Sequence, residues 1–431
     1  MKAVIMAGGK GTRLASVIHD IPKPMVKLAD KPLLEYQIEN LKENEITEII
    51  LVIGHLGNVI KEHFGNGKKF GVHITYFEEK EPLGTAGALF YLKDVLKDNF
   101  VLLFGDLFVN INFQRFIKYH QMKNAKITLY THPNSHPYDS DIIVTNEDGQ
   151  VIDWSYKNTK RTQDYKNQVN AGIYVVSPEV LKNIKKNQKT DLEKDVIINM
   201  IPCESVYAYS CTEYVKDIGT PKRLEKVEKD YQNGVCEKRN LKNRQKCIFL
   251  DRDGTINRHV GFLTSPDQLE LEDSAAEAIQ KINESEYLAI VISNQPVVAR
   301  GECSFDMLEK IHNKMYTLLG KDGAYLDGLF FCPHHPDSGF EGEVTQLKID
   351  CNCRKPKTGL IMQAAETFNI DAGNSWMIGD TTMDIQTGIN AGMRTILVKT
   401  GEGGMDGKYN VIPDYVARNL SEAVDIITNE D

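Results

Sequence analysis

The sequence predicts an α/β protein of two domains, each built on a mainly parallel β-sheet. Short runs rich in Val, Ile, Leu and Phe alternate with segments of helical periodicity, as in consecutive βα units. A buried strand that leads into a polar loop occurs at the start of the chain and again from residue 247. The length of 431 residues also exceeds that of one ordinary domain.

The first domain is expected over residues 1–232, with a Rossmann-like fold and a mixed sheet. Strands are predicted at 3–7, 49–53, 74–77 and 101–104, and helices at 33–43 and 86–96. From 126 to 180 the pattern changes, and a hairpin is predicted to turn at Asp148 and Gly149. We expect this part to form a lid of mixed strands around a substrate.

The polar run 233–246 is predicted to be a linker, and the second domain to occupy 247–431. Three apolar strands there, CIFLDRDGT, LAIVISNQ and SWMIGD, each end on polar residues. In an open α/β sheet, ligands bind outside the carboxyl ends of the strands. These three strand ends should therefore converge on one crevice of a doubly wound parallel sheet.

Composition narrows the classes of function. A net charge of −9 argues against a surface that neutralises a nucleic-acid backbone. The apolar run at the start is too short to span a membrane and leads into glycines instead of a cleavage site. We therefore expect a cytoplasmic protein that acts on small anionic molecules, with a homo-oligomer possible, and without nucleic-acid or membrane partners.

A glycine-rich loop follows the first strand, in the sequence AGGKGTRL, with PKPM after it. Gly8, Gly9 and Gly11 let the backbone approach a phosphate chain, and Arg13 and Lys23 would neutralise its charge. A tight strand-to-helix turn is the plainer interpretation of such a loop. Neither the Walker ending nor the dinucleotide spacing is present.

Further motifs follow in order: LGTAGAL at 83–89, FGD at 104–106, NAGIY at 170–174, LEKD at 192–195 and DIGTP at 217–221. Together with the glycine loop they resemble the sugar-phosphate nucleotidyltransferases. The resemblance covers residues 1 to about 230. It implies that a sugar phosphate attacks the α-phosphorus of a nucleoside triphosphate and displaces pyrophosphate.

The same resemblance assigns roles to individual residues. The triphosphate would be held by Gly8, Gly9, Gly11, Thr12 and Arg13, with Lys23 on the reacting phosphates. The nucleotide would be lined by Gly84, Thr85 and Gly87, Mg²⁺ held by Asp106 and Asp217, and the sugar bound by Asn170, Gly172, Glu193 and Lys194. Taken alone, Asp106 is typical of a strand-end turn, Asp217 of a helix cap, and Glu193 with Lys194 of a solvated face.

The second domain opens with Asp251 and Asp253 at the end of a strand, in the motif DRDGT. A carboxylate nucleophile that attacks a phosphate needs a cation to shield it and an acid/base nearby. Asp251 would be the nucleophile, and Asp253 would protonate the leaving group and then activate water. Pairs of acids in loops are common, so the prediction depends on what lies at the other strand ends.

Those strand ends carry Ser293 with Asn294, Lys355 in CRKP, and Asp380 followed by Asp384. The set resembles the haloacid-dehalogenase superfamily of phosphatases over about 247 to 400. The resemblance implies that Ser293, Asn294 and Lys355 bind the transferring phosphate. It also implies Mg²⁺ on Asp251, Asp380 and the Asp253 carbonyl, with support from Asp384.

Two close pairs of metal-binding residues, Cys332 with His334 and Cys351 with Cys353, predict a structural Zn²⁺ site. His335 is the alternative fourth ligand. The plainer interpretation is a pair of buried thiols beside surface histidines.

The segments SNQPVVARG, CPHHP and CNCRKP resemble the heptose 1,7-bisphosphate phosphatases, although histidinol-phosphate phosphatases share the zinc loop. By resemblance, Arg300 and Arg354 contact the substrate's remaining phosphate or sugar. Pro296, Val297 and Val298 depart from the small, flexible segment expected there.

Together the two resemblances imply one pathway. The second domain would leave a heptose 1-phosphate, as the α-anomer, and the first would use GTP to make GDP-D-glycero-D-manno-heptose for surface polysaccharide. A first domain that only binds nucleotide for regulation is disfavoured because Arg13, Lys23, Asp106 and Asp217 are all present, and a phosphatase acting on nucleic-acid ends is disfavoured by the acidic net charge. The alternative that competes is the same two reactions with another sugar or base.

Overall fold

The computed structural model describes residues 1–9, 21–203 and 205–430. The chain forms two compact units. The first comprises Met1–His132, Ile143–Ser155 and Asn170–Asn240, and the second comprises Pro133–Ile142, Tyr156–Val169 and Leu241–Asp431. Among the described residues, no helix is long and apolar enough to cross a membrane.

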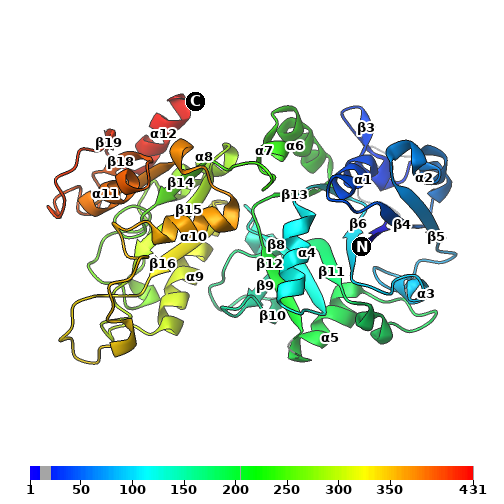
Figure 1. Ribbon diagram of the computed structural model, residues 1–431, viewed down its shortest axis with the longest axis horizontal. Coiled ribbons are helices and arrows are strands. Elements are labelled where there is room, and N and C mark those ends of the chain that lie inside the picture. The colour runs from blue at the N-terminus through cyan, green and yellow to red at the C-terminus, as the bar shows by residue number, and fades with distance from the viewer. Residues whose placement is uncertain (10–20, 204, 431) are drawn as a thin grey trace. The chain divides into compact units, whose positions relative to one another are not determined.

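Within its described residues, the first unit is built on a nine-stranded mixed sheet (Figure 1). The strand order is β10-β9-β11-β6-β1-β4-β5, and β8 pairs with both β11 and β12. β1 runs parallel to β4 and β6, whereas β11 is antiparallel to β6. The strands are β1 Lys2–Met6, β4 Glu48–Ile53, β5 His73–Glu78, β6 Phe100–Phe104, β8 Ile127–His132, β9 Ile142–Thr145, β10 Val151–Ser155, β11 Val169–Val176 and β12 Val206–Ser210.

A separate two-stranded ribbon ends at one predicted site residue, Asp217, and directly follows another, Asp106. β7, Leu107–Asn110, runs antiparallel to β13, Tyr214–Asp217. Phe108 and Tyr214 on the ribbon pack in an apolar cluster with Leu33 of α1 and Val227 of α6. The ribbon is therefore anchored on its apolar side.

The helices of the first unit surround the sheet, and α4 packs against β8 and β12 (Figure 1). They are α1 Leu33–Glu43, α2 Gly57–Phe64, α3 Leu89–Leu92, α4 Phe113–Met122, α5 Ile198–Met200, α6 Pro221–Gln232 and α7 Val235–Lys238. A short ladder joins β2, Lys27–Leu28, to β3, Lys31–Pro32. α7 lies inside the run 233–246, and Cys236 on it is buried in the same apolar cluster as Phe108.

Over residues 241–430, the second unit contains a six-stranded parallel sheet of order β16-β15-β14-β17-β18-β19. Both faces of the central strands β14, β15 and β17 are buried, which explains their nearly continuous apolar sequences. The strands are β14 Cys247–Leu250, β15 Leu288–Asn294, β16 Gly328–Cys332, β17 Trp376–Gly379, β18 Arg394–Val398 and β19 Tyr415–Ala417.

Helices cover both faces of the parallel sheet. One face packs in a single apolar cluster with residues of α8, α9 and α12, whereas α10 contacts β15 and β16, and α11 contacts β17 and β18. The helices are α8 Ala275–Glu284, α9 Phe305–Lys321, α10 Gly359–Phe368, α11 Thr382–Asn390 and α12 Leu420–Glu430.

The predicted fold class is confirmed, with one correction in detail. The strands β8, β9, β10 and β11 of the segment 126–180 join the mixed sheet. The helix predicted at 86–96 is limited to Leu89–Leu92. The hairpin around Asp148 and Gly149 is present as β9 and β10, and Gly149 has a φ of +80° in its turn.

Candidate functional sites

The strand ends predicted to converge in the second unit do so around a buried lysine. Lys355 is 4% exposed, and its Nζ lies 2.8 Å from Asp251 Oδ1 and 2.6 Å from Asp384 Oδ1. Asp251 follows β14, and Asp384 lies in the first turn of α11 after β17. Asn294, at the end of β15, accepts from the Lys355 N–H at 3.0 Å and donates to the Lys355 carbonyl at 3.2 Å. The lysine is thus fixed at its backbone and at its charged end.

Three buried carboxylates lie close enough to share one cation. Asp251, Asp380 and Asp384 each place a carboxylate oxygen within 4.8 Å of the others. Asp380 Oδ2 accepts from the Glu402 N–H at 2.7 Å, whereas Asp380 Oδ1 is buried without a hydrogen-bond partner. Gly254 has a φ of +81°, and an added Cβ would lie 2.2 Å from Asp380 Oδ2, so only glycine fits there. The donor set, which consists of hard oxygens, suits Mg²⁺.

Burial and mutual repulsion strongly perturb these acids. Burial first, and then the charge of Asp384, raise the pKa of Asp251 to about 7, although Lys355 opposes the shift. Burial first, and then Asp251 and Asp384, raise the pKa of Asp380 to about 8. Such crowding of like charges is relieved by a divalent cation.

Asp253 has a different set of partners from the three-carboxylate cluster. Its oxygens accept from Arg252 Nη2 at 2.8 and 2.9 Å, from Asn257 Nδ2 at 3.0 Å and from Gln295 Nε2 at 3.0 Å. Burial alone would raise the pKa of Asp253, but Arg252 and the two amides outweigh it and lower the pKa. Gln295 also donates to Ser293 Oγ at 2.8 Å and so links Asp253 to the predicted phosphate-binding serine.

The two predicted pairs, Cys332 with His334 and Cys351 with Cys353, come together in one group. Cys351 Sγ lies 3.4 Å from Cys332 Sγ and 3.2 Å from Cys353 Sγ, and His334 Nδ1 lies 3.3 Å from Cys353 Sγ. A tetrahedral zinc ion with bonds of about 2.0 to 2.3 Å separates its ligand atoms by roughly 3.4 to 3.8 Å. His335 turns instead toward Asp337, so it is not part of this group.

Arg300 and Arg354 lie near this loop in different surroundings. The Arg300 guanidinium lies 4.2 Å from the centre of the Phe262 ring and 4.3 Å from that of Phe340, and it pairs with Glu302 at 2.8 Å. Arg354 Nη1 donates to the His334 carbonyl at 3.0 Å.

In the first unit, Lys23, Asp106 and Asp217 meet at one end of the β7–β13 ribbon. Lys23 Nζ lies 2.5 Å from Asp106 Oδ2, and the Ile218 N–H, next to Asp217, donates to the Asp106 carbonyl at 3.1 Å. An added Cβ on Gly219 would lie 2.7 Å from Asp217 Oδ1 and 3.7 Å from Lys23 Nζ.

Arg223 pairs with Asp217 at 2.6 Å. Burial would raise the pKa of Asp217, but Arg223, the Gly219 N–H and Lys23 outweigh it and lower the pKa. This carboxylate is therefore held ionised beside Lys23. Of the glycine loop, Gly8 and Gly9 are described, whereas Gly11, Thr12 and Arg13 lie outside the described residues.

The predicted nucleotide loop is fastened to the segment after residue 189. Gly84 has a φ of +83°, and an added Cβ would lie 2.4 Å from the Thr190 carbonyl oxygen. Thr85 Oγ1 accepts from the Leu192 N–H at 2.7 Å, and an added Cβ on Gly87 would lie 2.4 Å from the Leu83 carbonyl oxygen.

The predicted sugar-binding residues share a hydrogen-bond network. Asn170 Nδ2 donates to Glu193 Oε1 at 2.7 Å, and the Tyr174 hydroxyl donates to the same oxygen at 3.0 Å. Gly172 has a φ of +78°, and its N–H donates to Asn170 Oδ1 at 3.2 Å. Lys194 is exposed. Glu193 is therefore not simply part of a solvated face.

The sequence did not predict the partners of the site carboxylates, nor the position of Glu79. Arg252, Asn257, Gln295 and Arg223 contact predicted site carboxylates, but only the tertiary structure shows these pairings. Glu79 follows β5, and its Oε2 lies 2.8 Å from the place of an added Cβ on Gly8. Burial raises the pKa of Glu79, although the Leu83 N–H opposes the shift.

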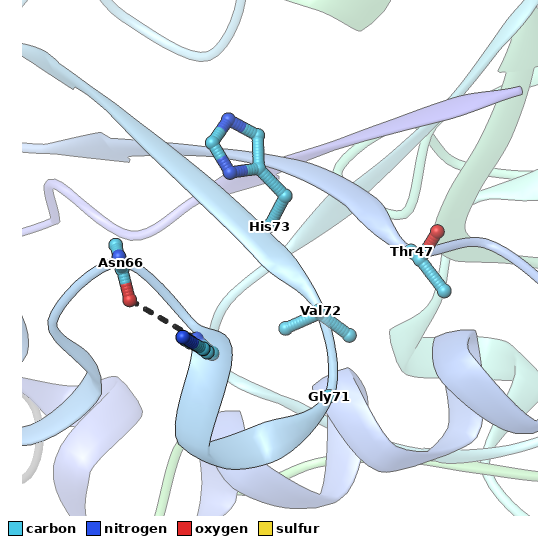
Figure 2. A pocket seen from close by; sticks show the side chains of 6 residues that line it. Thr47, Asn66, Gly71, Val72 and His73 are labelled. Carbon is cyan, nitrogen blue, oxygen red and sulfur yellow. Dashed lines mark hydrogen bonds between the residues drawn. The ribbon is translucent and has the colours of Figure 1, made fainter.

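A hollow with a volume of about 390 Å³ lies in the first unit, apart from the predicted site residues. Figure 2 shows the side chains around it. The hollow is lined by Thr47, Asn66, Lys68, Gly71, Val72 and His73. Thr47 precedes β4 and His73 begins β5, so the hollow lies at the amino ends of these strands. Gly8, which follows β1, lies at the opposite, carboxyl edge, and we assign the hollow no role in the site.

Taken together, the folds and sites define an enzyme of phosphoryl and nucleotidyl chemistry. The family model "Nucleotidyl transferase" matches residues 2–234, and a HAD-hydrolase-like model matches residues 352–423. The chain therefore belongs to the nucleotidyl transferase family, and its second half belongs with the HAD-like phosphatases.

Individual relatives match one half each. The D-glycero-beta-D-manno-heptose-1,7-bisphosphate 7-phosphatase of Pasteurella multocida is 38% identical over 185 residues, which are 42% of this chain and 97% of the relative. The mannose-1-phosphate guanyltransferase of Yarrowia lipolytica is 32% identical over 240 residues, which are 55% of this chain and 63% of the relative. Among solved structures, HddC from Yersinia pseudotuberculosis is 25% identical with a TM-score of 0.47, covering 53% of this chain and 99% of its own.

The raised pKa values of Asp251 and Asp380 predict that the stability of the second unit depends on pH and on Mg²⁺. In metal-free protein, the folded state keeps a proton on each acid up to a pH near its pKa, which is about 7 for Asp251 and about 8 for Asp380. The unfolded chain loses them near pH 4. The free energy of unfolding should therefore fall as the pH rises from about 5 to about 8, and saturating Mg²⁺ should offset this loss.

Urea unfolding of this unit, with chelator or with Mg²⁺, at about pH 5.5 and about pH 7.5 measures the effect. Asp380→Asn, which removes one of the titrating groups, should show a weaker dependence. A stabilisation by Mg²⁺ that is equal at both pH values would contradict the prediction.

Proposed function

We propose that the chain catalyses two consecutive steps of nucleotide-heptose synthesis. The second unit removes the 7-phosphate of D-glycero-D-manno-heptose 1,7-bisphosphate. The first unit then joins the resulting heptose 1-phosphate to a nucleotide, GMP from GTP, and releases pyrophosphate. The observation that carries this proposal is the presence of both sites in one chain, because the product of the phosphatase is a sugar 1-phosphate, the class of compound that the transferase consumes.

In the phosphatase step, an oxygen of Asp251 attacks phosphorus and the bond to the C7 oxygen breaks. Lys355, 2.8 Å from Asp251, is placed to hold the transferring phosphate and offset its charge together with Ser293. Asp253 gives a proton to the leaving oxygen and then takes one from the water that hydrolyses the aspartyl-phosphate. Asp251, Asp380 and the Asp253 carbonyl, supported by Asp384, would hold Mg²⁺, and the ion would supply further charge neutralisation.

In the transferase step, a phosphate oxygen of the sugar attacks the α-phosphorus of the nucleotide. Gly8, Gly9, Gly11 and Thr12 offer backbone donors to the triphosphate. Lys23 and Arg13 offset the charge of the reacting groups, and Asp106 and Asp217 are placed to bind Mg²⁺. Because Lys23 already contacts Asp106 at 2.5 Å, the lysine and the metal would meet the same phosphates.

The sugar and the base have different contacts in this proposal. Asn170, Gly172, Glu193 and Lys194 bind the sugar, and the network joining Asn170 to Glu193 supports a shared role. Gly84, Thr85 and Gly87 line the nucleotide. Mannose 1-phosphate, the substrate named for the Yarrowia lipolytica relative, is the alternative sugar that an assay must distinguish.

Glu79 supports guanine as the base. It stands between Gly8 and the loop at 83–87, with its Oε1 fixed by the Leu83 N–H at 3.3 Å. Guanine presents two adjacent donors, N1–H and the exocyclic amino group, which one carboxylate can accept together. The corresponding edges of adenine, uracil and cytosine lack this pair of donors.

The Cys332, His334, Cys351 and Cys353 group is proposed to hold a structural Zn²⁺. The distances between its ligand atoms support a closed tetrahedral site without an open position for water. A cytoplasmic location is part of the proposal, because the ligands must remain thiolates and not form disulfides.

Arg300 and Arg354 are proposed to hold the 1-phosphate away from Asp251. If the phosphatase took the anomeric phosphate, it would destroy the substrate of the transferase. Arg300 already pairs with Glu302, but a reversed monophosphate would leave the half-buried Arg354 without the phosphate that it contacts in this proposal, which opposes that binding mode.

A coupled assay tests the whole proposal. Supplied with heptose 1,7-bisphosphate, GTP and Mg²⁺, the wild-type chain should release one phosphate and one pyrophosphate per nucleotide-heptose. Asp251→Asn should abolish phosphate release yet still use added heptose 1-phosphate, and Asp106→Ala should do the reverse, because each removes a group from one unit only. Both anomers are supplied separately, since the Pasteurella multocida relative is named for the β-anomer and the resemblance implies the α-anomer. Rapid hydrolysis of heptose 1-phosphate by the wild-type chain would refute the proposal.

The assignment of guanine is tested by Glu79→Gln. The amide presents a donor where guanine also donates, so kcat/KM with GTP should fall by about 5- to 150-fold while kcat/KM with the other triphosphates does not fall. The matched control is Glu78→Gln, since Glu78 pairs with Lys61 at 2.7 Å on the surface. An equal loss in the two variants would remove Glu79 from base selection.

Metal analysis of protein purified without chelator should find one Zn²⁺ per chain. The double variant Cys351→Ser, Cys353→Ser should lose it, and its second unit should melt at a lower temperature because the binding energy of a structural metal contributes to folding. Cys303→Ser, at a buried cysteine outside the group, is the matched control. Wild-type protein without zinc would refute the assignment.

A further inference from the structure

Arg252 is a fully buried arginine directly beside the proposed nucleophile. Its exposed fraction is 0%, although arginine is almost never fully buried unless it is paired. Its guanidinium contacts Asp253 on one side, through Nε at 3.2 Å and Nη2 at 2.8 and 2.9 Å. On the other side, Nη1 lies 3.3 Å from His312 Nε2. The buried charge is thus paired with Asp253 and braced by a histidine.

His312 connects this pair to the body of the fold. It lies on α9, is 6% exposed and packs its ring against Phe331. Burial first, and then the charge of Arg252, lower the pKa of His312 to about 3, so the ring is neutral and Nε2 can accept from Arg252. The orientation of the guanidinium is therefore set by a long, well-packed helix.

The remaining partners of Asp253 come from the substrate side. Asn257 Nδ2 donates to Oδ1, and Gln295 Nε2 donates to Oδ2, each at 3.0 Å. Gln295 also donates to Ser293 Oγ, so these amides fasten the carboxylate to the phosphate end of the site. Arg252 alone fastens it to α9.

We propose that Arg252, braced by His312, is the positioning residue that aims Asp253 at the leaving oxygen of the substrate. This inference rests on the proposed phosphatase function. Asp253 is ionised while it is paired with Arg252, so the proton comes with a substrate phosphate that binds as the monoanion. In the first half of the reaction, the bond from Asp251 to phosphorus forms, the bond from phosphorus to the sugar oxygen breaks, and Asp253 passes the proton of the phosphate to that oxygen. In the second half, water attacks the aspartyl-phosphate, Asp253 takes its proton and passes it to the departing phosphate, and the Asp253 carboxylate is restored.

A positioning role predicts a difference between two substrates that a merely structural role does not predict. An alkyl oxygen is a poor leaving group and needs the proton, whereas 4-nitrophenolate leaves readily without one. Loss of positioning should therefore affect hydrolysis of the sugar phosphate much more than hydrolysis of 4-nitrophenyl phosphate. A general loss of folding would affect both substrates equally.

The test compares four variants on both substrates. Arg252→Lys keeps a charge but loses the planar fork, and His312→Leu removes the acceptor for Nη1. Both should lower kcat/KM for heptose 1,7-bisphosphate by about 10- to 100-fold, and for 4-nitrophenyl phosphate by no more than about threefold. His312→Gln, which restores an acceptor, and Met315→Leu, a buried neighbour on α9, should stay within about threefold of wild type on both.

The outcomes separate this inference from the function on which it rests. Equal losses on the two substrates, or no loss in folded Arg252→Lys and His312→Leu, would overturn the positioning role. If one of these variants does not fold, the other decides. Failure of the wild-type chain to hydrolyse the bisphosphate would instead refute the proposed function.

Discussion

Like charges crowded at the carboxyl ends of parallel strands are the constraint that shapes the phosphatase unit. Asp251, Asp380 and Asp384 are all buried and lie within reach of one another, which costs free energy unless cations stand between them. Lys355 is the protein's own cation, and its two contacts of 2.6 and 2.8 Å cross the group. The incoming phosphate adds more negative charge to the same place. A site that folds only when this repulsion is offset is therefore already organised to stabilise a reacting phosphate.

In the transferase unit, the negative charge of the acidic side chains is offset in a different way. Of its two predicted metal ligands, Asp217 ends β13 and Asp106 directly precedes β7, and each carboxylate is paired with a cationic side chain, Lys23 or Arg223. The pair with Arg223 helps to keep Asp217 ionised, as the lowered pKa of Asp217 indicates. In the phosphatase, by contrast, the pKa of Asp251 is raised. One chain thus carries two acid sites whose protonation responds to different surroundings.

The sequence could predict those parts of the sites that follow from strand order. Polar residues at the ends of parallel strands must lie on one edge, so the meeting of Asp251, Ser293 and Asp380 followed from topology alone. Arg252 escaped prediction because a charged residue next to an acid is usually solvated, and its burial depends on α9, more than 50 residues later in the chain. Glu79 escaped because its neighbour Gly8 is distant in sequence. The sequence pointed to His334 as the fourth metal ligand, with His335 as the alternative, and the structure brings His334 into the group.

The cysteine and histidine group has a direct mechanical link to the catalytic residues. Cys332 is the last residue of β16, and Cys353 lies two positions before Lys355. Arg354, between them, donates to the carbonyl of His334 at 3.0 Å. A metal that joins these ligands would therefore fix the backbone of Arg354 and Lys355. Because Lys355 contacts both Asp251 and Asp384, at 2.8 and 2.6 Å, a fixed backbone at residue 353 would also hold these two contacts in place.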